Sequence, residues 1–417
     1  MQNLNSGSNN IAIGQTALFS NTSGSQNIAL GYSTLRNNLI GSGSIAIGHR
    51  ALQSGSRFDN TIAIGDRAGG NLLNNCSPLD NIFIGCQAGF GATTGTTQFN
   101  SGARLRDNIA IGKLAGCSLS SKYNPSIYCG NTGYPDYLPL FGPGWTTTAR
   151  NIFIGNYSGQ NVCAPVPSNA SALTYGNNTA IGHASLCSNT TATCNTAIGS
   201  YSLKATTTGN QNVAIGGSSL CSNTTGINNT AIGTRALEAT TIGTRNTAIG
   251  HGALLTNVTG SQNVAVGSRA LENHKTCRTV AVGYSALLSN TTGIRNTAVG
   301  FQAALSNTTA CGNTAIGYYA LRTNQTSARN TAVGFCALFT TIGGSNTAVG
   351  YRALATLGNS NNQVAVGYSA LRYLTTGLRN TAIGYTAALR LTTGNYNIAI
   401  GPEALCSNIT GTGNLLS

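Results

Sequence analysis

A short pattern of apolar and polar residues recurs along the whole chain. Its core is Asn-x-Ala-Ile/Val-Gly, as in Asn195–Gly199 and Asn246–Gly250. The final glycine recurs 21 times, mostly at steps of 17 residues and twice at steps of 16. One such unit holds too few apolar residues to bury a core alone and has no helical periodicity, so the pattern predicts stacked coils. We therefore expect an all-β fold, a parallel β-solenoid (β-roll) of about 21 coils with a 17-residue period.

Two short strands are predicted in each coil. The first ends at the repeat glycine, the second covers the following x-x-Ala-Leu segment, and a polar Thr-Thr-Gly stretch returns the chain to the next coil. The glycine column has no exception, as expected where φ is positive or a neighbouring backbone comes close. We expect the Ile or Val before the glycine to face the core and the preceding Ala to face outward. An outward Ala column fits either lateral packing of protomers or a flat surface facing solvent.

The regular period is interrupted between residues 66 and 181, which divides the predicted solenoid into regular coils (1–65), coils with long inserted loops (66–181) and regular coils again (182–417). The steps lengthen to 20, 27, 43 and 27 residues, and seven of the eight prolines lie here. Insertions in solenoids form loops on one face, which is often the binding face. The alternative is a disulfide-stapled loop cluster that only shields the coil edge. Candidate interface residues in the longest loop are Tyr134, Tyr137, Phe141 and Trp145.

Charge and composition exclude several classes of function. The 22 basic and 8 acidic residues give a net charge of +14, but the basic residues are scattered, so we expect no nucleic-acid partner. Sparse arginines keep a polar surface soluble, and attraction to an anionic polysaccharide or another negatively charged surface is the alternative. No run of 18 apolar residues exists, so no membrane insertion is expected. The acids form no catalytic pair and the Cys and His residues lack metal-site spacing, so we expect neither an enzyme nor a cofactor.

Cysteine usage favours an oxidising compartment, because the chain is polar and yet has 12 cysteines. Cys187 and Cys194 stand at the two ends of one return loop and form a candidate disulfide.

Acceptor motifs for N-glycosylation, Asn-x-Ser/Thr, are frequent, and many lie seven residues after a repeat glycine. That column would line one edge of the solenoid with glycans if occupied; the alternative is that Asn-Thr-Thr-Gly is simply a good turn sequence. The candidate acceptors are Asn21, Asn75, Asn156, Asn169, Asn177, Asn189, Asn223, Asn228, Asn257, Asn290, Asn307, Asn324 and Asn408.

The Asn-x-Ala-Ile/Val-Gly unit, with a small residue three positions after the glycine, resembles the head repeats of trimeric autotransporter adhesins and similar repeats in viral and phage fibre proteins. The resemblance covers nearly the whole chain through one short motif. It implies a parallel β-roll and a surface-exposed, adhesive or fibrous protein.

These observations predict a structural subunit of an extracellular fibre or appendage, at a cell or virion surface, that assembles with copies of itself. Leu415 and Leu416 occupy a strand position and are candidate interface residues for head-to-tail stacking through open sheet edges. The alternative is an adhesin or receptor-binding fibre that uses the 66–181 loops, with surface glycans as partners.

Overall fold

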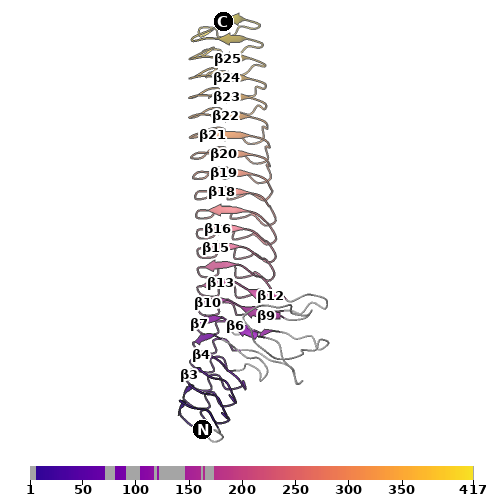
Figure 1. Cartoon of the computed structure of the whole chain (residues 1–417). Helices are drawn as coiled ribbons and strands as arrows, with labels where there is room; N and C mark the ends of the chain where they lie inside the picture. Colours follow the sequence, from indigo (N-terminus) through magenta and orange to yellow (C-terminus); the bar gives the residue numbers. More distant parts are fainter. Residues whose placement is uncertain are drawn as a thin grey trace. The chain divides into compact units, whose positions relative to one another are not determined.

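The computed structural model describes residues 6–70, 80–90, 104–116, 120–121, 146–160, 163–164 and 173–416. It is a parallel β-solenoid, as predicted, in which short strands lie one above another and form a 22-stranded sheet (Figure 1). The described residues include no helix, and no segment among them could cross a membrane as a helix.

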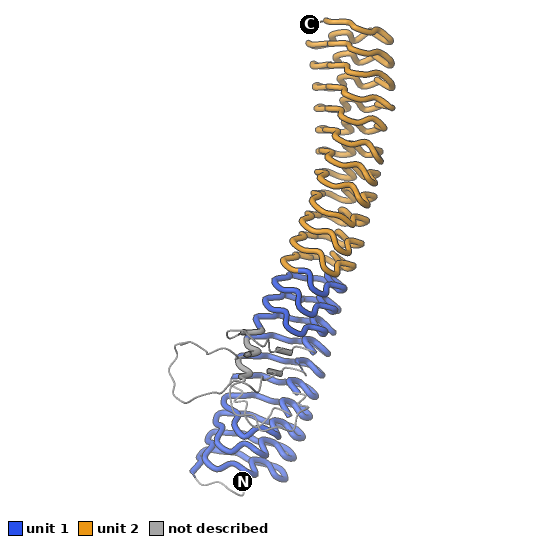
Figure 2. The backbone as a smooth tube through the Cα atoms, turned by 90° about the vertical axis from the view of Figure 1, so that its right-hand side faces the viewer, with its two compact units in different colours: residues 1–226 blue, residues 227–417 orange. Residues whose placement is uncertain are grey.

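The chain divides into two compact units, Met1–Gly226 (unit 1) and Ile227–Ser417 (unit 2), coloured separately in Figure 2. The strands of unit 1 are β1 (Ile11–Ile13), β2 (Ile28–Leu30), β3 (Ile45–Ile47), β4 (Ile62–Ile64), β5 (Ile82–Ile84), β6 (Arg104–Arg106), β7 (Ile109–Ile111), β8 (Ser120–Ser121), β9 (Thr146–Ala149), β10 (Ile152–Ile154), β11 (Cys163–Ala164), β12 (Leu173–Gly176), β13 (Thr179–Ile181), β14 (Thr196–Ile198) and β15 (Val213–Ile215). Among them, β6, β9 and β12 form a three-stranded sheet and β8 and β11 a two-stranded sheet, separate from the 22-stranded sheet.

Unit 2 consists of regular coils. Its strands are β16 (Thr230–Ile232), β17 (Thr247–Ile249), β18 (Val264–Val266), β19 (Val280–Val282), β20 (Thr297–Val299), β21 (Thr314–Ile316), β22 (Thr331–Val333), β23 (Thr347–Val349), β24 (Val364–Val366), β25 (Thr381–Ile383), β26 (Ile398–Ile400) and β27 (Leu415–Leu416). Neighbours pair in parallel and in register, so each residue lies above the residue of the same column.

The coil that contains Gly250 shows what fills the interior. Asn246, Ala248 and Leu254 are fully buried, whereas Thr247 and Ile249 are partly exposed. The prediction that Ile or Val faces the core and Ala faces outward was therefore wrong. Asn and Ala alternate with Thr and Ile along the strand, and the narrow interior accepts the small pair.

Stacked asparagines connect the coils inside the solenoid. The Nδ2 of Asn246 donates to Oδ1 of Asn229 at 3.1 Å and to the carbonyl of Gly260 at 2.8 Å. Its Oδ1 accepts the backbone N–H of Asn263 at 3.1 Å. Each asparagine thus satisfies buried polar groups of two coils, which compensates for the cost of burying its own amide.

One strand per coil is observed where two were predicted. After the glycine, every second residue has positive φ, for example Gly252 (62°) and Leu254 (51°). The segment still forms inter-coil backbone bonds, because Gly252 donates to Thr234 at 3.0 Å and Leu254 donates to Ala270 at 3.0 Å. Because every second residue is left-handed, the segment keeps the hydrogen bonds between coils but lacks the dihedral angles of a β-strand. It is therefore a series of turns joined by a ladder of backbone hydrogen bonds.

The repeat glycines require both their conformation and their size. Gly250 has φ of 130°, and a Cβ there would lie 2.6 Å from the carbonyl carbon and oxygen of Gly267 in the next coil. The glycine column therefore sets how closely the coils stack.

In two coils, the core has a large residue at the usual Ala position and a glycine at the usual Leu position. Phe83 and Phe153 occupy the usual Ala position and are fully buried. In the same coils, Gly89 and Gly159 replace the usual Leu, and a Cβ at either position would collide with the phenyl ring. The phenyl ring fills the volume that leucine occupies elsewhere, so the packing of the interior is conserved.

Candidate functional site

The outward side of the sheet in unit 2 presents parallel columns of β-branched residues. The first column lies three residues before each repeat glycine and holds Thr, Val or Ile; the second directly precedes the glycine and holds Val or Ile. Members of the second column, such as Ile249, Val299, Ile316 and Ile383, are 36–40% exposed. This column therefore forms a continuous line of partly exposed apolar side chains along the sheet.

A third column, directly after the glycine, is aromatic in seven consecutive coils. We call it the aromatic ladder. Neighbouring rings stack with centroids 4.9–5.4 Å apart and interplanar angles of 3–18°. The ladder consists of Tyr284, Phe301, Tyr318, Phe335, Tyr351, Tyr368 and Tyr385.

Each ring stacks with its faces against neighbouring rings of the chain, so its edges are the part exposed to solvent. All seven are 37–56% exposed, although each stacks on its neighbours. A side-chain hydrogen bond with Tyr319 raises the pKa of Tyr318 above its ordinary value, further from neutral pH. Together with the Val and Ile column that directly precedes the glycine, the ladder forms an apolar strip along unit 2, which we call the apolar face.

Sequence reasoning missed the aromatic ladder, although its signal is present in the repeat. Tyr or Phe directly follows the glycine from Gly283 to Gly384. Alignment of the copies shows this column, but only the structure shows that it is exposed and stacked.

The predicted glycan edge is not compatible with the structure. The Asn residues seven positions after the glycine point into the coil, and the Nδ2 that would carry the glycan donates instead to a backbone carbonyl, as in Asn257 to Gly260 at 2.9 Å. A glycan on this atom would have to lie inside the solenoid. The fully buried members are Asn21, Asn189, Asn223, Asn257, Asn290, Asn307 and Asn324.

The remaining acceptor candidates are in different environments. Asn156, Asn177 and Asn228 are exposed, and Asn408 is partly exposed. Asn75 and Asn169 lie outside the described residues.

The predicted disulfide is not formed. Cys187 and Cys194 both carry free thiols. The Cys187 thiol contacts the carbonyl of Lys204 in the next coil at 3.7 Å, and its neighbour in the chain is Ser188.

The structure describes only some of the predicted interface residues. Tyr134, Tyr137, Phe141 and Trp145 lie outside the described residues, so the loop-based adhesin hypothesis stays a prediction. Leu415 and Leu416 in β27 are 72% and 47% exposed. Within the described part of the chain, no group of three or more His, Cys, Asp or Glu residues could hold a metal ion.

Comparison with known proteins identifies no relative: no family model, no curated protein and no solved structure matches this chain. The function must therefore be argued from the surfaces themselves.

Proposed function

We propose that this chain is a structural subunit of an extracellular fibre or surface appendage, built from copies of itself. The observation that carries the proposal is the apolar face of unit 2, with its aromatic ladder. The resemblance of the repeats to adhesin heads and fibre proteins, together with the three exposed glycan acceptors, supports the extracellular location.

The partner that best fits the apolar face is the same face of a second copy. The columns repeat at every coil, about 4.8 Å apart, so two such faces match along their length in register. The seven coils of the ladder and the two apolar columns, each about 6.6 Å wide, give roughly 450 Å² per chain, less than the roughly 800 Å² that each partner contributes to a standard interface and typical of a weak one. Exposed aromatic side chains are among the residue types that interfaces favour.

A fibre needs a second contact, because a face that pairs only with itself closes into a dimer. We place this contact at the sheet edges, where a coil of another copy can continue the parallel ladder. This is the head-to-tail stacking predicted from the sequence, and Leu415 and Leu416 are its candidate residues on one edge.

The test compares the full chain with two double variants by sedimentation and electron microscopy. Tyr318→Arg with Phe335→Arg places two charges in the middle of the ladder. Ile242→Arg with Ile409→Arg is the control, because both isoleucines are more than 50% exposed but lie on return turns away from the sheet. We expect wild type and control to associate side by side and the ladder variant to lose this side-by-side association, with unchanged circular dichroism.

Two outcomes would contradict the proposal. One is a wild-type chain that stays monomeric at every accessible concentration. The other is equal association of the ladder variant and the control.

A further inference from the structure

A second surface of unit 2 carries positive charge. Five arginines occupy the position five residues before the repeat glycine, and all are exposed. We call them the arginine column. They are Arg245, Arg278, Arg295, Arg329 and Arg379.

No acidic residue shares this column within 227–417. The acidic residues of unit 2 are Glu238, Glu272 and Glu403, all of which follow a repeat glycine, whereas the arginine column precedes it. Glu238 and Glu272 form ion pairs with Arg235 and Arg269. The positive charge of the arginine column is therefore not neutralised by an ion pair among the described residues.

The backbone fixes where the arginine side chains begin. Arg245, Arg295 and Arg329 have φ of 57–61°, and their N–H groups donate to carbonyls of the preceding coil at 3.0–3.1 Å. Each arginine therefore starts from the same point of its coil. The column covers eight coil steps, about 38 Å at 4.8 Å per step. This spacing creates a line of charge parallel to the stacking direction.

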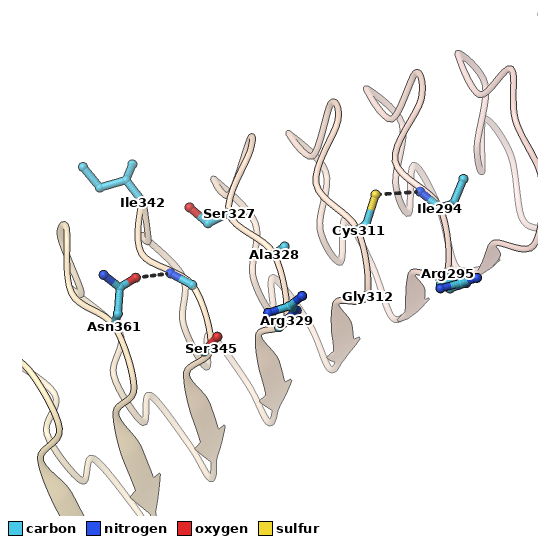
Figure 3. Close-up of a pocket in the computed structure, with 11 residues that line it drawn as sticks. Ile294, Arg295, Cys311, Gly312, Ser327, Ala328, Arg329, Ile342, Ser345 and Asn361 are labelled. Carbon is cyan, nitrogen blue, oxygen red and sulfur yellow. Dashed lines mark hydrogen bonds between the residues drawn. The ribbon is translucent and has the colours of Figure 1, made fainter.

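An open groove of about 520 Å³ runs beside the column over five coils (Figure 3). Arg295 and Arg329 stand two residues before the strands β20 and β22 on one side, and Cys311, Ser327 and Ile342 line the other. The groove thus combines two cations with hydroxyl, thiol and apolar contacts.

Hydroxyl groups accompany the arginines. Thr247, Thr297, Thr331 and Thr381 follow four of the five arginines at a distance of two residues, on the outward side of the strand. Guanidinium groups bind carboxylates and sulfates in a bidentate manner, and hydroxyls bind sugar hydroxyls.

From this arrangement we infer that the arginine column and its groove bind a linear acidic polysaccharide, with its carboxylate or sulfate groups on the arginines. A nucleic acid is also a linear polyanion, but its single strands need aromatic faces on which bases stack. The rings of the aromatic ladder stack on each other, and the groove is lined by no ring. The one ring at a column position of unit 2, Tyr396, lies outside the groove and is covered by the guanidinium of Arg379, 5.7 Å from its centroid. The inference does not rest on the proposed assembly, because every contact lies within one chain.

The experiment measures binding of the full chain to heparin and to polygalacturonate, with neutral dextran and single-stranded DNA as comparison ligands. The test variant is Arg278→Gln, Arg295→Gln and Arg329→Gln. The control variant is Arg235→Gln, Arg269→Gln and Arg352→Gln, which removes the same charge two residues after the glycine. Glutamine already occurs in both columns with positive φ, at Gln262 and Gln302, so both variants should fold.

We expect the test variant to lose at least about tenfold in affinity for one of the acidic polysaccharides and the control to lose less than about threefold, with binding weakened by salt. Dextran should not bind. An equal loss in both variants would show only general charge attraction and overturn the inference. Absence of binding to both acidic polysaccharides, or tighter binding of DNA, would overturn it too. Association of the wild-type chain is a separate readout, so failure here leaves the assembly proposal unaffected.

Discussion

At the scale of single residues, His274 is the exception in a column of buried polar groups. It stands where the neighbouring coils have Asn257 and Asn290, and it is fully buried. Its Nδ1 accepts from Nδ2 of Asn290 at 3.0 Å, and its Nε2 lies 3.2 Å from Oδ1 of Asn263. Both contacts are satisfied by a neutral ring with the proton on Nε2, and burial lowers the pKa of His274 to about 4.

This pKa gives the stability a defined pH dependence. Between pH 6.5 and about 4 the unfolded chain binds a proton at His274 and the folded chain does not, so the free energy of unfolding falls as pH falls. The loss at pH 5 is about 2 kcal/mol relative to pH 8. We expect His274→Asn to remove this loss, because asparagine fits the column and does not titrate. Urea denaturation at both pH values measures the difference.

The control for this prediction is His251→Asn, since His251 is exposed and follows a repeat glycine. It should leave the pH dependence unchanged. If wild type and His274→Asn lose stability equally on acidification, the neutral buried histidine is not the cause.

At the scale of the coil, the exchange of Phe83 with Gly89 makes a quantitative prediction. Phe83→Ala removes a buried ring and should cost about 3–5 kcal/mol. Gly89→Leu alone should also destabilise, because its side chain would collide with the ring. The double variant should recover part of the loss, since it restores the Ala and Leu of ordinary coils. Leucine accepts this backbone, as Leu254 does at φ of 51°.

The measurement is a double-mutant cycle by chemical denaturation. A favourable coupling of about 1–3 kcal/mol is expected for residues in direct contact. Additive costs of the two substitutions would show that the ring and the glycine do not share one space.

The coil also shows what the sequence can and cannot predict. The period and the glycine column predicted the solenoid correctly, because stacking requires every coil to repeat the same backbone. The side of the sheet that Ala faces was predicted wrongly, since hydrophobicity alone places Ile inside. Here the width of the interior decides which side chains face inward. The signal in the sequence was the asparagine two residues before the alanine, because residues two apart in a strand share a face. The prediction of a second strand was wrong because leucines such as Leu254 adopt a positive φ, which the conformational preferences of a single leucine disfavour.

At the scale of the whole molecule, each kind of surface follows from which columns face outward. The apolar face and the arginine column consist of outward positions, whereas the predicted glycan edge falls on an inward position. A column can be recognised from the sequence, but its direction depends on backbone conformation at the turns. The surfaces were therefore less predictable than the fold.

The same distinction predicts which acceptors carry glycans when the chain is secreted from a eukaryotic host. Asn228 and Asn177 are exposed and should be modified, whereas Asn257 and Asn290 are buried and should remain free. A glycan on either buried amide would prevent its hydrogen bond to the return turn and could not fit in the coil. Peptide mass spectrometry after glycosidase treatment locates the modified residues, with Asn228→Gln as the control for assignment. Occupancy of Asn257 or Asn290 in folded protein would mean that this column faces outward, contrary to the structure.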